Sequence, residues 1–364
     1  MEILLYKLWW LSFEEISLTK KYKLYEYFGD AYHVYFATRS ELLDSRILSK
    51  SEVEDFIVNR SKSDLIRIYD EFIKTPFSFV TIEDDDYPKQ LRTIYNPPYG
   101  LFYYGKLPQL DKTVSIVGAR GCSEYGKHMA SLLGKELSDA GFTIVSGMAK
   151  GIDTFAHIGC LQGKSATVAV LGNGVDEIYP KENNLLYEEI ASHGAVVSEF
   201  PIGTKSTAKN FPIRNRIVAG LSKSIIVVEA RLKSGSLITA DLALEQGKEI
   251  YVVPGRVGDK LSEGCNKLIT QGAGVICSID GLLEELSPTI TKPVIGVKKE
   301  ENKISTLTKE QLLVYSYFDF YPISIAAVQE KSGMDYLHLI SVIFSLVNFG
   351  VLKEVFKNEY VICG

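Results

Sequence analysis

A basic segment in the middle of the chain combines the two kinds of side chain that suit an unpaired nucleic-acid strand. Between Glu199 and Glu229 there is no acidic residue, and the positive charges in that interval are Lys205, Lys209, Arg214, Arg216 and Lys223. Phe211 lies directly before Pro212, a residue favoured in the first turn of a helix. Cations bind phosphates, and a flat ring offers a face on which a base can stack. The segment 211–216 is therefore the predicted centre of a single-stranded nucleic-acid site.

A structural role is the alternative for the same residues. Phe211 could belong to the core, and the charges could form a solvated face. Because Arg214 and Arg216 are two positions apart on the predicted helix, their side chains point in different directions. One of them could therefore be structural, and Glu229 at the end of the next strand is a candidate partner. We assign Arg214 to the nucleic acid ahead of Arg216.

Two loops upstream have compositions suited to an anion. The first contains Gly118, Arg120 and Gly121, and it lies between an apolar run and an amphipathic stretch. Glycines let backbone N–H groups approach a phosphate closely, and the following helix presents its positive end. Arg120 adds a guanidinium that can bind a phosphate through two N–H groups. Position 120 is not glycine, so the loop is not a Gly-x-Gly-x-x-Gly fingerprint; a strand-to-helix turn with a salt-bridged arginine is the alternative.

The second loop begins at Ser146-Gly147 and contains Lys150. Asp153 and His157 follow it on one face of a helix, a spacing that also occurs in metal or acid–base sites. An aspartate near a helix start is more often a partner of the helix dipole, so we expect neither a metal ion nor catalysis here. Further along, Ser234-Gly235-Ser236 opens another helix in the same manner.

The elements that position these loops alternate along the chain. The apolar, strand-like runs are 114–117, 142–145, 167–171, 195–197, 225–228, 250–253 and 275–277. The helices predicted between them are 124–140, 151–162, 182–192, 212–221, 236–246 and 264–271. This alternation indicates βαβ units and a buried parallel sheet, an α/β fold of Rossmann-like type. Because ligands bind outside the carboxyl ends of such strands, the loops above are predicted to share one edge.

The flanking segments differ in character from this α/β region. We expect residues 1–78 to form a small helical domain, in which Gly29 ends one helix and Ala31 begins another. Residues 79–286 form the Rossmann-like domain, and 287–304 form a linker. In the last segment, 305–364, three predicted helices precede a β-hairpin, which is the order of a winged-helix domain. The helices are 308–318, 323–332 and 335–348.

The third helix of that C-terminal domain carries no Lys or Arg. A helix that reads DNA normally presents basic and amide side chains. The sequence therefore favours a domain that contacts protein over one that contacts DNA, and both alternatives stay open.

Bulk properties place the protein among ordinary globular chains. Its 364 residues carry 40 Lys and Arg against 45 Asp and Glu, a net charge of -5 that does not exclude a local positive site. The five cysteines form no Cys-x-x-Cys pair, which is typical of thiols in a reducing cytosol. Glu2 and Lys7 argue against a signal peptide, and no apolar stretch approaches the length of a membrane span. We expect a cytoplasmic protein that holds no metal and no cofactor.

Six motifs in order resemble the DNA-processing protein A family, also called DprA or Smf. They are Val117-Gly118-x-Arg120, Ser146-Gly147-x-Ala149-x-Gly151-Ile152-Asp153, Tyr179-Pro180-x-Glu182-Asn183, Ser198-Glu199-Phe200-Pro201, Phe211-Pro212-x-Arg214-Asn215-Arg216 and Ser234-Gly235-Ser236-Leu237-x-Thr239-Ala240. Each motif alone is weak, and their order is specific. The run from Asp86-Tyr87-Pro88 to Tyr104-Gly105 also resembles the family's entry to its Rossmann-like domain. One departure is Asn173, at a place where cysteine is more usual.

The resemblance implies a non-enzymatic protein that binds single-stranded DNA, forms a homodimer through its Rossmann-like domain and loads the recombinase RecA during natural transformation. It also implies a sterile-alpha-motif-like (SAM-like) N-terminal domain and a winged-helix C-terminal domain. The residues assigned to DNA are Gly118, Arg120, Ser146, Gly147, Lys150, Lys209, Phe211, Arg214, Asn215 and Arg216. Those assigned to the dimer interface are Asn266, Leu268, Ile269, Thr270 and Ala273.

Two other functions compete with this one. Nucleotide phosphoribohydrolases that resemble lysine decarboxylases share the Rossmann-like superfamily and carry Pro-Gly-Gly-x-Gly-Thr-x-x-Glu. Here Pro254-Gly255 stands alone, and the loop at 234–240 lacks the glutamate. A transcription factor acting through residues 305–364 is the third possibility, and it would require sequence-specific binding to duplex DNA by that segment.

Overall fold

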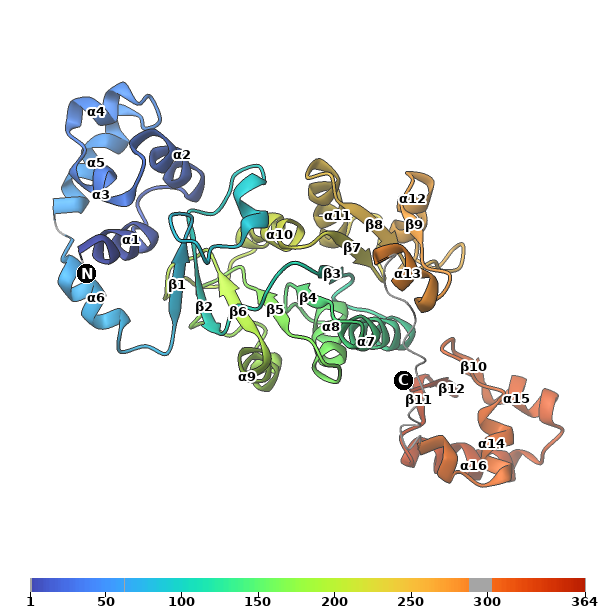
Figure 1. Ribbon diagram of the computed structural model, residues 1–364. Helices are drawn as coiled ribbons and strands as arrows, with labels where there is room; N and C mark the ends of the chain where they lie inside the picture. Colours follow the sequence, from blue (N-terminus) through green and yellow to red (C-terminus); the bar gives the residue numbers. More distant parts are fainter. Residues whose placement is uncertain (1, 62, 288–302, 364) are drawn as a thin grey trace.

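A computed structural model describes residues 2–61, 63–287 and 303–363 of the chain (Figure 1). Its centre is a nine-stranded sheet with the order β1-β2-β6-β5-β4-β3-β7-β8-β9. The strands are β1 (Ser78–Thr81), β2 (Gly100–Gly105), β3 (Thr113–Val117), β4 (Thr143–Ser146), β5 (Thr167–Val170), β6 (Ala195–Ser198), β7 (Ser224–Val227), β8 (Glu249–Val252) and β9 (Gly274–Val275). Every pair from β6 to β9 is parallel, which confirms the predicted parallel sheet.

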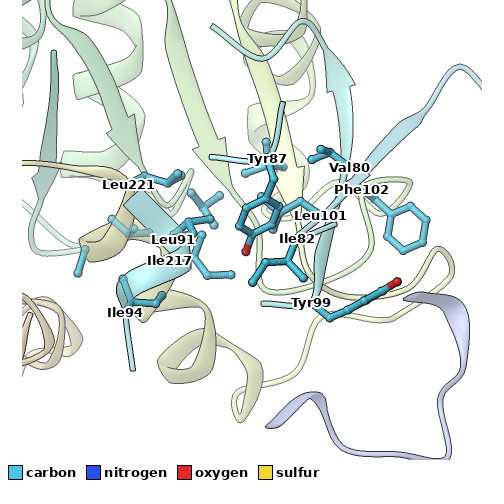
Figure 2. Close-up of a cluster of buried hydrophobic side chains, with 14 of the residues drawn as sticks. Val80, Ile82, Tyr87, Leu91, Ile94, Tyr99, Leu101, Phe102, Ile217 and Leu221 are labelled. Carbon is cyan, nitrogen blue, oxygen red and sulfur yellow. The ribbon is translucent and has the colours of Figure 1, made fainter. Parts of the chain in front are cut away.

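The antiparallel strands β1 and β2 were not expected. They extend the sheet beyond β6, where β2 pairs with β6 in the register Phe102↔Ser198. Between them, the segment that contains the 3₁₀ helix η1 (Lys89–Thr93) packs against a helix of the α/β region. Figure 2 shows this cluster, in which Leu91 and Ile94 lie beside Ile217 and Leu221.

Helices cover both faces of the sheet. They are α7 (Glu124–Asp139), α8 (Ile152–Leu161), α9 (Asn184–His193), α10 (Asn210–Leu221), α11 (Gly235–Glu245), α12 (Glu263–Thr270) and α13 (Ile279–Leu286), with the 3₁₀ helix η2 (Lys181–Asn183) before α9. Alternate residues of one strand point to opposite faces. On β3, Ile116 packs in the cluster that contains α7 and α8, whereas Val117 packs in the cluster that contains α10 and α11.

The sheet has a topological switch point between β3 and β7. From β3 the chain proceeds through β4 and β5 to β6, and it then returns to the other side of β3 with β7, β8 and β9. Neighbouring connections diverge at such a point and leave a crevice at the carboxyl ends of the strands. The loops that follow β3 and β7 border this crevice.

In the described part of the N-terminal segment, six helices precede the sheet. Its helices are α1 (Glu2–Ser12), α2 (Leu18–Phe28), α3 (Ala31–Phe36), α4 (Arg39–Asp44), α5 (Lys50–Ser61) and α6 (Leu65–Phe72). Gly29 ends α2 with a φ of 93°, a left-handed conformation that glycine adopts without steric cost. The fully buried Trp10 packs near Tyr99 of the sheet domain, at a ring-centroid distance of 6.5 Å. The helical segment and the sheet therefore share one continuous core.

The C-terminal segment has a separate core. Its elements are the 3₁₀ helix η3 (Lys303–Thr306), α14 (Lys309–Tyr315), β10 (Ile323–Ser324), α15 (Ile325–Ser332), α16 (Tyr336–Asn348), β11 (Leu352–Phe356) and β12 (Glu359–Ile362). The strands form a small sheet in the order β10-β12-β11. This segment contacts α7 through Phe320, whose ring stacks on His128 at 4.9 Å, and through Lys353, whose Nζ lies 2.7 Å from Glu124 Oε1.

None of the helices in the described ranges is long and apolar enough to cross a membrane.

Candidate nucleic-acid interface

A cavity of about 690 Å³ opens at the carboxyl edge of the sheet, at the switch point between β3 and β7. The start of α10 lines it together with the loops that follow β3, β4, β5, β6 and β7. The charged residues in its lining are Arg120, Asp153, Arg214, Arg231 and Lys233. Four cations against one carboxylate give the lining a net charge of +3, although the whole chain carries -5. The cavity is therefore a local positive site on an acidic protein.

Arg120 and Phe211 meet at this cavity, as the sequence predicts. The guanidinium carbon of Arg120 lies 4.9 Å from the ring centroid of Phe211. The Arg120 side chain is exposed and, among the described residues, has no ion-pair partner. A cation held over an aromatic face without a carboxylate remains available to a phosphate.

Arg214 forms the floor of the cavity, and most of its hydrogen-bonding capacity is used within the protein. The residue is 4% exposed. Its Nη1 donates to the carbonyl oxygen of Gly147 at 2.7 Å and also to that of Val170, so it joins the loops after β4 and β5. Burial lowers the pKa of Arg214 to about 10, and the nearby Asp153 opposes that shift. Arg214 thus combines a structural role with a place in the cavity lining.

Gly147 is required by this arrangement. A Cβ at position 147 would lie 2.6 Å from Nη2 of Arg214 and 2.7 Å from Oδ2 of Asp153. The backbone N–H of Gly147 donates to Asp153 Oδ2 at 3.1 Å. The glycine therefore permits the buried arginine and aspartate to lie against the backbone of the second loop.

Arg216 lies outside the cavity and forms a buried ion pair. Its Nη2 is 2.7 Å from both carboxylate oxygens of Glu199, and its Nε donates to the carbonyl oxygen of Asn96 at 2.9 Å. The suggested pairing with Glu229 is wrong, because Glu229 instead accepts hydrogen bonds from the backbone N–H and hydroxyl of Ser123. Arg216 thus connects α10 to the end of β6 and to the segment that precedes β2.

The other residues assigned to DNA divide into two groups. Gly118 and the half-buried Asn215 line the cavity. Ser146 is buried, and its hydroxyl donates to the carbonyl oxygen of Ile116 at 2.6 Å, so it holds β4 to β3. Lys150 and Lys209 are exposed but do not line the cavity. The Nζ of Lys150 lies 2.5 Å from Glu182 Oε1.

Sequence reasoning missed three residues of the lining that could contact a ligand. Arg231 and Lys233 are exposed on the loop after β7, and Tyr179 precedes η2. The two cations follow Glu229, the carboxylate that ends the basic interval, and they directly precede the motif 234–240. A basic interval extended past that one carboxylate includes both of them, and Tyr179 belongs to the motif 179–183, which was not assigned to DNA.

Asp153 and His157 are both buried in α8 and do not form a paired site. Asp153 Oδ2 accepts from the backbone N–H of Gly147 and, at 3.4 Å, from that of Ala149. Burial raises the pKa of Asp153, whereas Arg214 acts in the opposite direction. His157 Nδ1 lies 2.7 Å from the hydroxyl of Thr167, and burial lowers the pKa of the imidazole to about 3. The residues that the structure describes contain no group of His, Cys, Asp and Glu side chains arranged to hold a metal ion.

The residues assigned to a dimer interface lie on and after α12, beside the edge strand β9. Leu268 is 4% exposed and packs in the core of its own chain, so its side chain is not available at the surface. Ile269 and Ala273 are half-buried, and Thr270 is exposed. Asn266 is also half-buried, and its Nδ2 donates to the carbonyl oxygen of Gly255 at 3.1 Å.

Comparison with known proteins finds relatives of this chain among bacterial DNA processing proteins. The DNA processing protein DprA of Bacillus subtilis is 38% identical over 280 residues, which cover 76% of this chain and 88% of the relative. The corresponding Streptococcus pneumoniae protein is 44% identical over 216 residues, 59% of this chain and 76% of the relative. For Protein Smf of Synechocystis, the match is 41% identical and spans only 60% of the relative.

Solved structures agree with the sequence comparison. The crystal structure of DprA from Streptococcus pneumoniae aligns with a TM-score of 0.69 at 35% identity and covers 79% of this chain and 98% of its own. A structure of DNA processing protein A from Helicobacter pylori, described by its single-stranded-DNA binding mode, aligns with a TM-score of 0.53 at 33% identity, covering 58% of this chain and 95% of its own. Residues 78–287, more than half of the chain, match the sequence profile of the DNA recombination-mediator protein A family. The chain belongs to that family.

Proposed function

We propose that this chain binds single-stranded DNA in the cavity at the carboxyl edge of its sheet and passes that DNA to the recombinase RecA during natural transformation. The observation that carries the DNA-binding part is the exposed Arg120 guanidinium over the ring of Phe211, inside a lining with a net charge of +3. Membership of a recombination-mediator family supports the part that involves RecA.

The cavity offers separate partners to the two components of a nucleotide. Arg120, Arg231 and Lys233 are exposed cations for phosphates, and Gly118 and Gly121 let backbone N–H groups approach from the loop after β3. Two neighbouring aromatic rings, Phe211 and Tyr179, also line the cavity, and an unpaired base can stack on an aromatic face. Neither kind of contact depends on base identity, so binding should be insensitive to sequence.

We also propose that the protein acts without catalysis at this site. The carboxylate in the lining, Asp153, is buried and accepts two backbone hydrogen bonds beside Arg214. A hydrolase requires a carboxylate or another base within hydrogen-bonding reach of the substrate. Binding is thus favoured over the phosphoribohydrolase alternative, and the absence of base release from nucleoside monophosphates would support it.

The remaining assignments are proposals about whole segments. The order of the C-terminal elements, with α14, α15 and α16 before the β11–β12 hairpin, supports a winged-helix domain. The six helices of the N-terminal segment are compatible with the SAM-like assignment. A homodimer could use the edge strand β9 and α12, where Ile269 and the exposed Thr270 lie near the edge of the sheet.

A salt titration of DNA binding tests the central proposal. Fluorescence anisotropy would compare labelled oligo-dT with a duplex of equal length between about 50 and about 300 mM salt, a range over which the Debye length falls by a factor of about 2.5. We expect tighter binding of the single strand and a linear fall of log K with log salt concentration. Equal affinity for both DNAs, or binding independent of salt, would contradict the proposed site.

A further inference from the structure

Tyr179 presents the more exposed of the two aromatic rings at the cavity. The residue lines the cavity and is 42% exposed. Its ring centroid lies 5.6 Å from that of Phe211, with the two planes inclined by 35°. Among the described residues, its hydroxyl has no hydrogen-bond partner, so the side chain is not retained there by a polar contact of its own.

Phe211, by contrast, is largely surrounded by protein groups. Arg120 lies over its ring at 4.9 Å, and Arg214 lies 6.0 Å from the same centroid. The backbone of Gly172 is so close that a Cβ there would lie 3.0 Å from Cδ1 of Phe211. With Tyr179 as a further neighbour, the half-buried Phe211 ring has little free face left for a base.

Hydrogen bonds hold the segment that carries Tyr179 to neighbouring parts of the domain. Pro180, the next residue, is buried. In η2, the Nδ2 of Asn183 donates to the carbonyl oxygen of Met148 at 3.0 Å and to the hydroxyl of Thr154 at 2.9 Å. These contacts join the segment to the loop after β4 and to α8, so the exposed tyrosine is positioned before any ligand arrives. Pre-positioning of this kind reduces the entropic cost of binding.

We infer that Tyr179 is the ring on which an unpaired base stacks, with Phe211 supporting it from behind and Arg120 left to bind the adjoining phosphate. This inference rests on the proposed single-stranded-DNA site and assigns its base-binding surface. Stacking on a tyrosine face tolerates every base, because each base has a flat π-surface. A base inside a duplex already stacks on its neighbours, so this surface selects single strands.

Replacement of Tyr179 tests the assignment. Removing a stacking ring costs about 1–3 kcal/mol per base, so Tyr179→Ala should weaken binding to oligo-dT by about 5- to 150-fold. Tyr179→Phe should bind as the unaltered protein does, because the face is retained. The slope of log K against log salt should be unchanged in both variants, since no charge is removed. Tyr95→Ala is the matched control, because Tyr95 is 86% exposed and lies outside the cavity lining.

An oligonucleotide of abasic residues separates stacking from a general disturbance of the site. The unaltered protein and Tyr179→Ala should bind that strand with equal affinity, because it has no base to stack. An equal loss on abasic and ordinary strands would overturn the inference and indicate that Tyr179 only supports the shape of the cavity. If Tyr179→Ala binds oligo-dT normally while Arg120→Ala does not, the base-stacking assignment fails and the proposed DNA site stands. If the unaltered protein does not bind oligo-dT, the proposed function itself fails.

Discussion

The buried pair between Arg216 and Glu199 leads to a prediction that separates a structural arginine from a DNA-binding one. The sequence assigned Arg216 to DNA, whereas the structure places its guanidinium against a carboxylate inside the protein. Replacement by methionine, Arg216→Met, keeps much of the side-chain volume and removes the charge. If Arg216 is structural, this change should lower the free energy of unfolding and leave DNA affinity of the folded protein nearly unaltered.

The magnitude follows from the burial of the partner. The Glu199 side chain is 2% exposed, and the Arg216 side chain is 10% exposed. Removing one member leaves a desolvated charge without compensation, which costs about 3–5 kcal/mol in buried ion pairs. Arg216 also donates to the carbonyl oxygens of Asn96 and Ile213, and those acceptors would lose their donor as well. We therefore expect a loss of about 3–5 kcal/mol in the free energy of unfolding.

Urea unfolding followed by tryptophan fluorescence would measure this loss, because Trp9 and Trp10 lie in the same continuous core. The double variant Arg216→Met with Glu199→Leu is the matched control. It removes the stranded carboxylate, so it should be more stable than Arg216→Met alone. The structural interpretation would be refuted by a stability loss below about 1 kcal/mol, the range of exposed ion pairs, combined with a large loss of DNA affinity.

Three further predictions concern the site, a buried histidine and the proposed dimer edge. Arg120→Ala should weaken binding to oligo-dT because one phosphate contact is lost. The slope of log K against log salt concentration should become shallower by about 0.7, which anisotropy titrations at several salt concentrations would measure. Burial lowers the pKa of His157 from the ordinary 6.5 to about 3. Between these two pH values the imidazole is protonated in the unfolded chain but neutral in the folded one, so the free energy of unfolding should fall as the pH decreases from 6.5 toward 3. Urea unfolding at pH 7 and pH 5 should show a loss of about 2 kcal/mol from this residue alone, absent in His157→Gln. Leu268→Ala is a core change and should lower the free energy of unfolding by about 2–5 kcal/mol. Ile269→Arg should chiefly lower the dimer fraction measured by sedimentation. An undiminished dimer fraction would exclude Ile269 from the interface.

The sequence by itself determined the parallel part of the fold and the loops that carry the site. Apolar runs and amphipathic stretches report local periodicity, and each predicted run overlaps a strand between β3 and β9. Gly29 was recognised because a helix end with positive φ has a local signature. The edge strands β1 and β2 lie in a turn-rich, aromatic stretch without such a signature, and they are strands because they pair with each other and with β6.

Only the tertiary structure decided what the segment 211–216 does. The sequence suggested Glu229 as the partner of an arginine in this segment, whereas the packing of α10 directs Arg216 to Glu199. The cavity lining likewise joins Tyr179, Arg120 and Arg231 from three distant loops. Residue type and spacing describe what a side chain can bind, whereas burial and direction decide whether it is free to do so. The helix predicted as the centre of the site therefore supplies its support, and the exposed groups that surround it form the proposed surface for DNA.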